Sequence, residues 1–305
     1  MIRYIYISYS LFKISYSLYP LFKNVPSWLK LLIKIAVTAA CLWYVVKKID
    51  WDLSWHLLQH SNKWWLLIAL VLIALSKIVS SFRLNIYFNN IGIYLKIKNQ
   101  LQLYWLGMFY NLFLPGGIGG DAYKVILLNK KYAEVSTKKI GAAVLLDRLS
   151  GVVALGVLAV IFYWLVFKGS NYSNWLLIAI LPGLIAYFFI SNKIFPSFKN
   201  GFYPVLSLGF LVQILQVIAV YCIMFSTNTG GHFSELQLLF LLSSIANMLP
   251  VTFGPFGARQ AVFLWGATQF NLNATEAVYI SLLFDLMQML VALIGGRWMY
   301  KNALG

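Results

Sequence analysis

Long apolar runs separated by short polar stretches make up most of the chain. A helix needs about 20 apolar residues to cross the hydrocarbon core of a bilayer, so runs of that length predict membrane spans. About six runs qualify: Leu29–Val46, Trp64–Phe82, Ile140–Phe167, Trp175–Ser191, Tyr203–Phe225 and Ala277–Trp298. The pattern therefore predicts an all-α polytopic membrane protein.

Two further apolar runs, Leu101–Leu114 and Leu236–Leu249, are too short to cross a bilayer comfortably, and both stop at Pro and Gly. Irregular backbone is tolerated at membrane depth only where it is buried in protein or lines a water-filled cavity. We therefore interpret the two runs as re-entrant helices broken by Pro and Gly.

The two broken helices belong to an internal repeat, in which Asn, Pro and Gly end the short run and an Asp follows within the next apolar run. The corresponding pairs are Asn111 and Asn247, Pro115 and Pro250, Gly120 and Gly257, and Asp147 and Asp285. Within each pair the separation is 135 to 138 residues. Repeated, broken membrane helices are typical of transporters. We place the two membrane repeats at residues 29–167 and 175–298.

The composition excludes an ordinary soluble domain, because 61% of the residues are hydrophobic, only 10% are charged, and the mean hydropathy is +0.78. Cys41 and Cys222 both lie inside apolar runs, which supports neither a disulfide framework nor a thiolate metal site. We expect no metal and no cofactor. The net charge of +16 in so apolar a chain indicates an anionic membrane surface as partner, and no nucleic acid.

The distribution of Lys and Arg predicts an orientation, because short loops rich in these residues stay on the cytoplasmic side. With a cytoplasmic N-terminus and re-entrant short runs, most cations lie inside, Arg83 among them. The outer side keeps only Lys47, Lys48, Lys63, Lys168 and Arg259. Residues 1–28 then form a cytoplasmic or interfacial segment and residues 299–305 a cytoplasmic tail. The second repeat is inverted relative to the first, and we expect the protein in the inner (plasma) membrane.

The first break contains Gly116, Gly117, Gly119 and Gly120, followed by Asp121. Glycines let the backbone turn sharply and approach a ligand, and free N–H groups at the start of a half-helix attract phosphate or carboxylate oxygens. We predict that an anionic headgroup binds here. The structural alternative is that Pro and Gly only end one helix and let the next pack closely.

Three ionisable residues are predicted to lie well inside spans: Asp147, Arg148 and Asp285. An unpaired charge there costs at least ~2.5 kcal/mol, so each must pair or face water. The planar guanidinium of Arg148 suits an oxyanion, and we expect it to bond to Asp285 or to a ligand rather than to its neighbour Asp147. An internal salt bridge that holds the repeats together is the structural alternative. Lys77 is expected to extend its side chain towards the membrane interface.

Amide side chains add polar candidates. Asn111 and Asn247 precede the two breaks by about one turn, where an amide can satisfy freed backbone groups. Gln213 and Gln216 can line a polar cavity or hydrogen-bond neighbouring helices. The complete predicted headgroup site is Asn111, Pro115, Gly116, Gly117, Gly119, Gly120, Asp121, Asp147, Arg148, Asn247, Pro250, Gly254, Gly257, Arg259 and Asp285.

These motifs resemble the transmembrane region of lysylphosphatidylglycerol synthases, which also occurs alone as small flippase-like proteins of the UPF0104 type. The matching segments are Asn111-Leu-Phe-Leu-Pro-Gly-Gly-Ile-Gly-Gly-Asp121, then Ala142-Ala-Val-Leu-Leu-Asp147-Arg148 with Gly151, and then Pro250-Val-Thr-Phe-Gly-Pro-Phe-Gly257 with Arg259. The resemblance extends from about residue 30 to 298. In the second break the family usually has a Gly-Gly pair and an Arg-Glu dipeptide, where this chain has Gly254-Pro255 and Arg259-Gln260.

The resemblance implies a protein that moves a lipid between leaflets, with headgroup passage past the first break, Arg148 and the second break. In the synthases a soluble domain follows and transfers the aminoacyl group; because this chain ends at Gly305, we expect no such activity. We predict transport of an anionic lipid or lipid-linked headgroup by a non-enzyme. The alternatives are a membrane-embedded transferase with a lipid-linked donor and a non-catalytic partner of an envelope-lipid enzyme; a homodimer is compatible with each.

Overall fold

The computed structural model describes residues 43, 47, 51–113, 119–227, 231–248 and 257–299. Within these ranges the chain is helical and contains no strand. Five of the helices are long and apolar enough to cross a membrane. The predicted all-α polytopic membrane protein is thereby confirmed. Most of the predicted span Leu29–Val46 lies outside the described residues, as do the N-terminal segment 1–28 and residues 300–305.

The five long helices correspond to five of the predicted spans. They are α5 (Lys63–Asn89), α8 (Thr137–Val166), α9 (Asn171–Ile194), α10 (Phe202–Ser226) and α13 (Ala274–Leu293), which continues into the 3-10 turn η3 (Ile294–Trp298). Their most apolar windows have mean hydropathies from 1.9 to 2.4. The main difference is in α5, which we expected to end at Phe82 and which continues to Asn89. That extension brings Arg83 inside the helix.

Polar residues at the helix starts explain two of these boundaries. The side chain of Asn62 accepts a hydrogen bond from the Trp64 backbone N–H at the start of α5. Asn273 accepts bonds from the N–H groups of Thr275 and Glu276 at the start of α13. Each cap satisfies backbone donors that a helix start leaves without an intrahelical partner.

The two short apolar runs also form helices, and each is followed by a second short helix. These pairs are α6 (Ile97–Phe113) with α7 (Gly119–Lys131), and α11 (Phe233–Met248) with α12 (Ala258–Gln269). Helices α4 (Trp51–His60) and η2 (Pro196–Gly201) are connectors. The order long, short, short, long thus occurs in α5–α8 and again in α10–α13. The re-entrant paths and the inversion of the repeats stay predictions.

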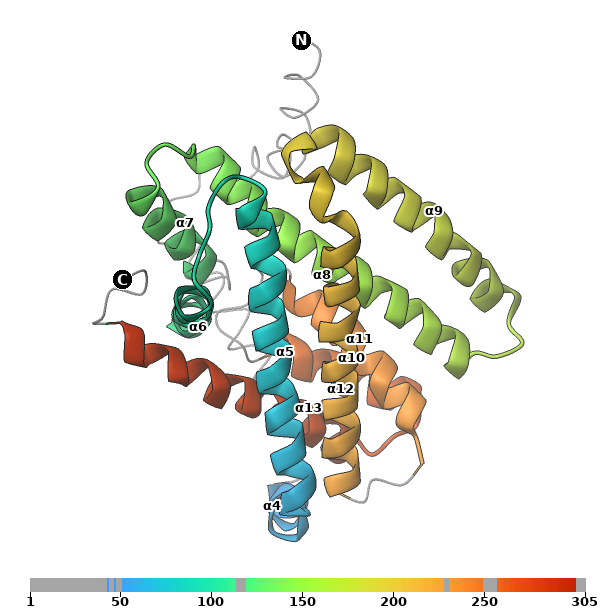
Figure 1. The fold of residues 1–305 in the computed structure, drawn as a ribbon. Helices are drawn as coiled ribbons and strands as arrows, with labels where there is room; N and C mark the ends of the chain where they lie inside the picture. The colour runs from blue at the N-terminus through green and yellow to red at the C-terminus, as the bar shows by residue number, and fades with distance from the viewer. Residues whose placement is uncertain are drawn as a thin grey trace, which may run out of the picture.

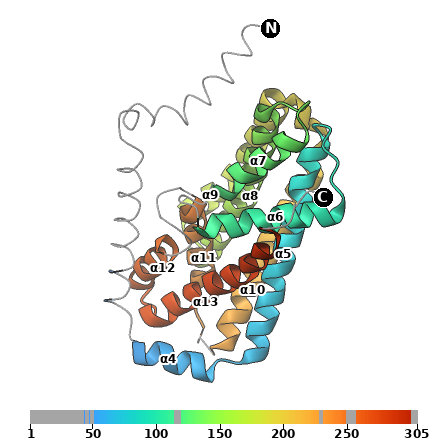
Figure 2. The same ribbon diagram turned by 90° about the vertical axis from the view of Figure 1, so that its left-hand side faces the viewer.

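Helices α5 and α10 run side by side over much of their length, and α8 crosses them obliquely (Figures 1 and 2). Apolar side chains are buried in two clusters. One includes Ile73 of α5, Phe263 of α12 and Phe284 of α13. The other includes Phe88 of α5 and Ile140 of α8. Along α5, Ser76, Lys77, Ser80, Ser81 and Arg83 lie between Ile73 of the first cluster and Leu84 of the second.

Candidate functional site

Helices α5, α6, α7, α8, α10, α11 and α12 surround a cavity of about 250 Å³. The predicted site residues that line it are Asn111, Asp121, Asp147, Arg148 and Arg259. Both glutamines of α10, Gln213 and Gln216, line it as well, which confirms the first of the two roles considered for them. Residues far apart in the sequence therefore meet at one polar cavity.

The other predicted residues lie elsewhere. Those outside the described residues are Pro115, Gly116, Gly117, Pro250 and Gly254. Those that are described but do not line the cavity are Gly119, Gly120, Asn247, Gly257 and Asp285. In this second group, Gly120 and Asp285 bond to residues that do line it, Asn111 and Arg259.

The start of α7 is held against α6 by an amide and two glycines. Asn111 Oδ1 accepts a hydrogen bond from the Gly120 backbone N–H at 2.8 Å, which confirms the structural role predicted for its amide. A Cβ atom on Gly120 would lie 1.8 Å from the backbone oxygen of Gly107. The two helices therefore approach at a distance that only glycine allows. This contact fixes the first turn of α7, where Asp121 is located.

Asp121 bonds to two cations. Lys124 Nζ lies 2.9 Å from Asp121 Oδ1, and Arg148 Nε donates to Oδ2. Lys124 also lies over the Tyr104 ring, 4.6 Å from its centroid. The side chain of Arg148 is 30% exposed whereas that of Asp121 is 11% exposed, so the arginine forms the accessible side of this group. Of the two partners expected for Arg148, Asp285 is wrong, because the packing of α7 on α8 brings Asp121 to Arg148 instead. A ligand as partner of Arg148 stays a prediction.

Asp147 pairs with Arg83, whose Nε donates to Asp147 Oδ1 at 2.7 Å. Both side chains are buried in the contact between α5 and α8. The prediction that placed Arg83 among the cytoplasmic loop cations is therefore wrong. From hydropathy alone, a charged residue at the edge of an apolar run can be placed either in the last turns of the helix or in the loop that follows. Here the ion pair with the buried carboxylate of Asp147 stabilises Arg83 within the helix.

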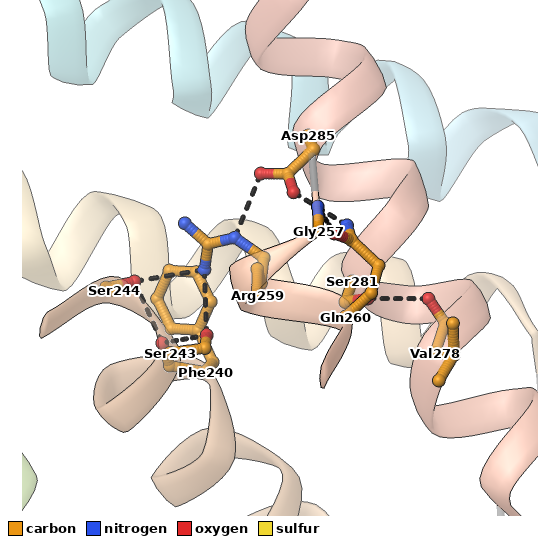
Figure 3. Close-up of polar contacts among 9 residues, drawn as sticks. All are labelled: Phe240, Ser243, Ser244, Gly257, Arg259, Gln260, Val278, Ser281 and Asp285. Carbon is orange, nitrogen blue, oxygen red and sulfur yellow. Dashed lines mark hydrogen bonds and ion pairs between the residues drawn. The ribbon is translucent and has the colours of Figure 1, made fainter. Parts of the chain in front are cut away.

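A further ion pair joins α12 to α13 (Figure 3). Arg259 Nε donates to Asp285 Oδ1 at 2.9 Å, and both side chains are 4% exposed. Arg259 Nη1 also donates to the hydroxyls of Ser243 and Ser244 on α11, at 3.1 and 3.0 Å. The guanidinium lies near two rings, those of Phe240 and Phe284. The prediction that Arg259 lies in an outer loop is wrong, because these partners hold it in the protein interior.

Gln260 completes this network. Its Nε2 donates to Asp285 Oδ2 at 2.8 Å, and its Oε1 accepts from the Gly257 backbone N–H at 2.7 Å. Gly257 has φ of +109°, a conformation that favours glycine. Asp285 is thus bonded through both oxygens, and Gln260 fixes the turn that leads into α12.

The sequence interpretation missed Lys77, Ser80, Arg83 and Lys124 as cavity residues. The first three recur at a spacing of three residues in α5, which places them on one face of the helix. This polar stripe within an apolar helix was the available signal. Lys77 lies near the middle of α5 and lines the cavity, so the expectation that it extends to the membrane interface is wrong.

The cavity carries an excess of positive charge. Its cations are Lys77, Arg83, Lys124, Arg148 and Arg259. The carboxylates are Asp121 and Asp147 in its wall and Asp285 behind Arg259. Five positive charges and three negative charges leave a formal charge of +2. No cluster of His, Cys, Asp or Glu suited to a metal ion occurs in the described ranges. The excess of Lys and Arg favours contact with an anion.

Gln260→Glu is expected to destabilise the protein, because it places a carboxylate oxygen where an amide now donates to Asp285. Loss of a buried donor costs about 1–3 kcal/mol, and more where a charge is left facing it. Thermal unfolding of the purified protein at pH 8 and pH 5 measures the effect. The deficit should shrink at pH 5, where the two carboxyl groups can share a proton. Equal stability of variant and wild type at pH 8 would contradict the network.

Comparison with known proteins agrees with this architecture. The family model of the lysylphosphatidylglycerol synthase TM region matches residues 31–296. A UPF0104 membrane protein of Pyrococcus horikoshii is 24% identical over 131 residues, which are 43% of this chain and 38% of the relative. The chain therefore spans well under half of that relative's length in this match. By the extent of the family match, the chain belongs to the family of the lysylphosphatidylglycerol synthase transmembrane region.

Proposed function

We propose that this protein moves an anionic lipid, or a lipid-linked anionic headgroup, between the leaflets of a membrane. The observation that carries the proposal is the cavity among membrane helices, whose five cations exceed the three nearby carboxylates. Taking a cation out of water is unfavourable unless an anion compensates it. The two surplus charges therefore favour a negatively charged ligand.

The cavity suits a headgroup rather than a complete lipid. Its volume of about 250 Å³ is below the range of about 300–1,000 Å³ typical of sites that enclose drug-sized ligands. Acyl chains are compatible with the hydrocarbon core, whereas a charged headgroup is not. A polar passage for the headgroup, with the chains left in the bilayer, removes the main barrier to leaflet exchange.

Two of the ion-pair groups suggest how transport could proceed. Asp121 with Arg148 joins α7 to α8, and Arg259 with Asp285 joins α12 to α13. These helices hold corresponding places in the two long, short, short, long segments. In the inverted arrangement that we propose, with cytoplasmic termini in the cell membrane, the two groups close the cavity towards opposite sides. Alternating access would then require each group to open in turn.

Leaflet exchange in proteoliposomes tests this function. A fluorescent anionic phospholipid is incorporated, and dithionite, which cannot cross the bilayer, reports the outer-leaflet fraction over time. Wild-type protein is expected to exchange lipid faster than protein-free vesicles, with and without an imposed proton gradient. Arg148→Ala is expected to abolish the increase and to remain folded, because Asp121 keeps Lys124 as a partner and Arg148 is partly exposed.

Gly156→Ala is the matched control for this assay. Gly156 lies on α8, the helix of Arg148, and a Cβ atom there would meet nothing within 4 Å. It should exchange lipid as wild type does. Exchange by Arg148→Ala at the wild-type rate would contradict the assigned site. No exchange by wild type would favour a membrane-embedded transferase or a non-catalytic partner of a lipid enzyme instead.

A further inference from the structure

Resting on the proposed function, we propose that Arg83 and Lys77 of α5, beside Gly151 of α8, form a phosphate subsite of the cavity. The ligand group is a terminal phosphate, a phosphomonoester, at the end of a lipid. From the sequence, Arg83 is expected in a loop and Lys77 at the membrane interface, and Gly151 stands only among the residues that resemble the family. None of the three is in the predicted headgroup site. Each of them lines the cavity.

The first observation is an incompletely bonded guanidinium. Arg83 is 6% exposed, and its Nε is used by Asp147. Its Nη1 atom is buried and has no hydrogen-bond partner among the described residues. A buried charged donor without an acceptor is unfavourable, so native structures seldom leave one that way. An oxygen of a bound anion within the cavity would satisfy it.

The second observation is the space beside that atom. A Cβ atom on Gly151 would lie 3.2 Å from Arg83 Nη1, and one on Gly209 of α10 would lie 3.7 Å from it. Glycines on two different helices thus keep side chains away from the same nitrogen. Gly151 of α8 also lines the cavity, so the space that its lack of a side chain leaves lies at the cavity wall. Nη1 itself is buried, so a ligand oxygen would reach it at the part of the cavity wall that Gly151 forms.

The third observation is a cation placed on the same helix face. Lys77 lies six residues before Arg83, with Ser80 between them, and the three share one face of α5. Lys77 forms no ion pair with any residue that the structure describes. Arg259 and Arg83 repel its positive charge, and the attraction of Asp285 offsets only part of that repulsion. An anion bound between Lys77 and Arg83 would replace this repulsion with attraction.

The charge and size of the cavity favour a phosphomonoester. Its formal charge of +2 matches a terminal phosphate, which carries about −1.5 to −2 at pH 7, better than the single charge of a phosphodiester. A cavity of about 250 Å³ accommodates a phosphate group together with a few waters.

Binding to the full chain in nanodiscs of neutral phosphatidylcholine tests the subsite. The probes are dihexanoyl phosphatidic acid, dihexanoyl phosphatidylglycerol and inorganic phosphate, titrated by calorimetry with the short-chain lipids below their micelle concentration. Wild type should bind phosphatidic acid several-fold more tightly than phosphatidylglycerol. It should also bind phosphatidic acid more tightly than inorganic phosphate, because the acyl chains add contacts with the surrounding bilayer.

Gly151→Ala is the critical variant, because its methyl group would occupy the space beside Arg83 Nη1 without changing any charge. Alanine also favours a helix more than glycine does, so folding should persist. Affinity for phosphatidic acid should fall at least about tenfold, as expected when a bond to a charged group is lost. Gly156→Ala, on the same helix with open space around it, should bind as wild type does. Arg83→Lys retains the charge beside Asp147 but lacks Nη1, and should show the same loss as Gly151→Ala.

Several results would overturn the inference. If Gly151→Ala and Arg83→Lys both bind phosphatidic acid with wild-type affinity, the proposed subsite is contradicted. Equal affinity for phosphatidic acid and phosphatidylglycerol would contradict the preference for a terminal phosphate. Equal affinity for phosphatidic acid and inorganic phosphate would assign the site to a soluble ion. The binding result is separate from transport: tight, Gly151-dependent binding without leaflet exchange would uphold the subsite and contradict the proposed function.

Discussion

Arg259→Met is expected to lower the free energy of unfolding by about 3–5 kcal/mol, because it leaves Asp285 as a buried carboxylate without its counter-charge. Asp285 is enclosed in α13 and would retain only the amide of Gln260. The hydroxyls of Ser243 and Ser244 would lose their shared donor as well. Denaturant titration of the purified protein in mild detergent, followed by Trp fluorescence, measures the difference.

The double variant Arg259→Met with Asp285→Leu distinguishes two contributions to the loss of stability: the attraction lost between the two side chains, and the cost of leaving the Asp285 carboxylate buried without a counter-charge. Removing both members of a buried ion pair is often nearly neutral, so the double variant should recover most of the stability lost in the single one. Arg148→Met is the matched control, since Asp121 keeps Lys124 and the pair is partly exposed. A double variant no more stable than Arg259→Met would show that Asp285 is not the source of the penalty.

Gly120→Ala is expected to be the most damaging small substitution in the first half of the chain. The new Cβ would lie 1.8 Å from the Gly107 oxygen and 2.9 Å from Asn111 Oδ1. The first of these atoms belongs to backbone and cannot rotate away, so α6 and α7 must separate. Overpacking usually costs about 1–3 kcal/mol, and we expect the upper end of that range or more. Because Asp121 is the next residue, leaflet exchange should be lost together with stability.

A graded series of glycine substitutions tests this explanation. A Cβ on Gly107 would collide with the flexible side chain of Lys124, which can move, so Gly107→Ala should be milder than Gly120→Ala. Gly156→Ala, with nothing within 4 Å, should be neutral or slightly stabilising. Folded yield by size exclusion and the thermal midpoint rank the three. A Gly120→Ala protein as stable as Gly156→Ala would contradict the close crossing of α6 and α7.

The sequence by itself determined the helical membrane architecture and most of the charged residues of the cavity. An apolar run long enough to cross the bilayer forms a helix there, because a helix pairs its backbone N–H and C=O groups within the segment and the hydrocarbon core offers them no other partners. Asp147 and Asp285 were found for the related reason that a charge within such a run must be compensated. Asn111 was found because a broken helix leaves N–H groups without partners, and the oxygen of a nearby amide can accept their hydrogen bonds.

Only the tertiary structure decided which charges pair. Arg148 bonds to Asp121 rather than to Asp285, because α7 packs on α8 while α12 packs on α13. Arg83 lies at the end of an apolar run, where hydropathy cannot distinguish the last turns of a helix from the loop that follows. Its assignment depends on the carboxylate of Asp147, which lies 64 positions away in the sequence. The hydropathy of a segment depends on its own residues alone. Which charges form ion pairs depends on which helix faces lie against one another, and only the tertiary packing determines this.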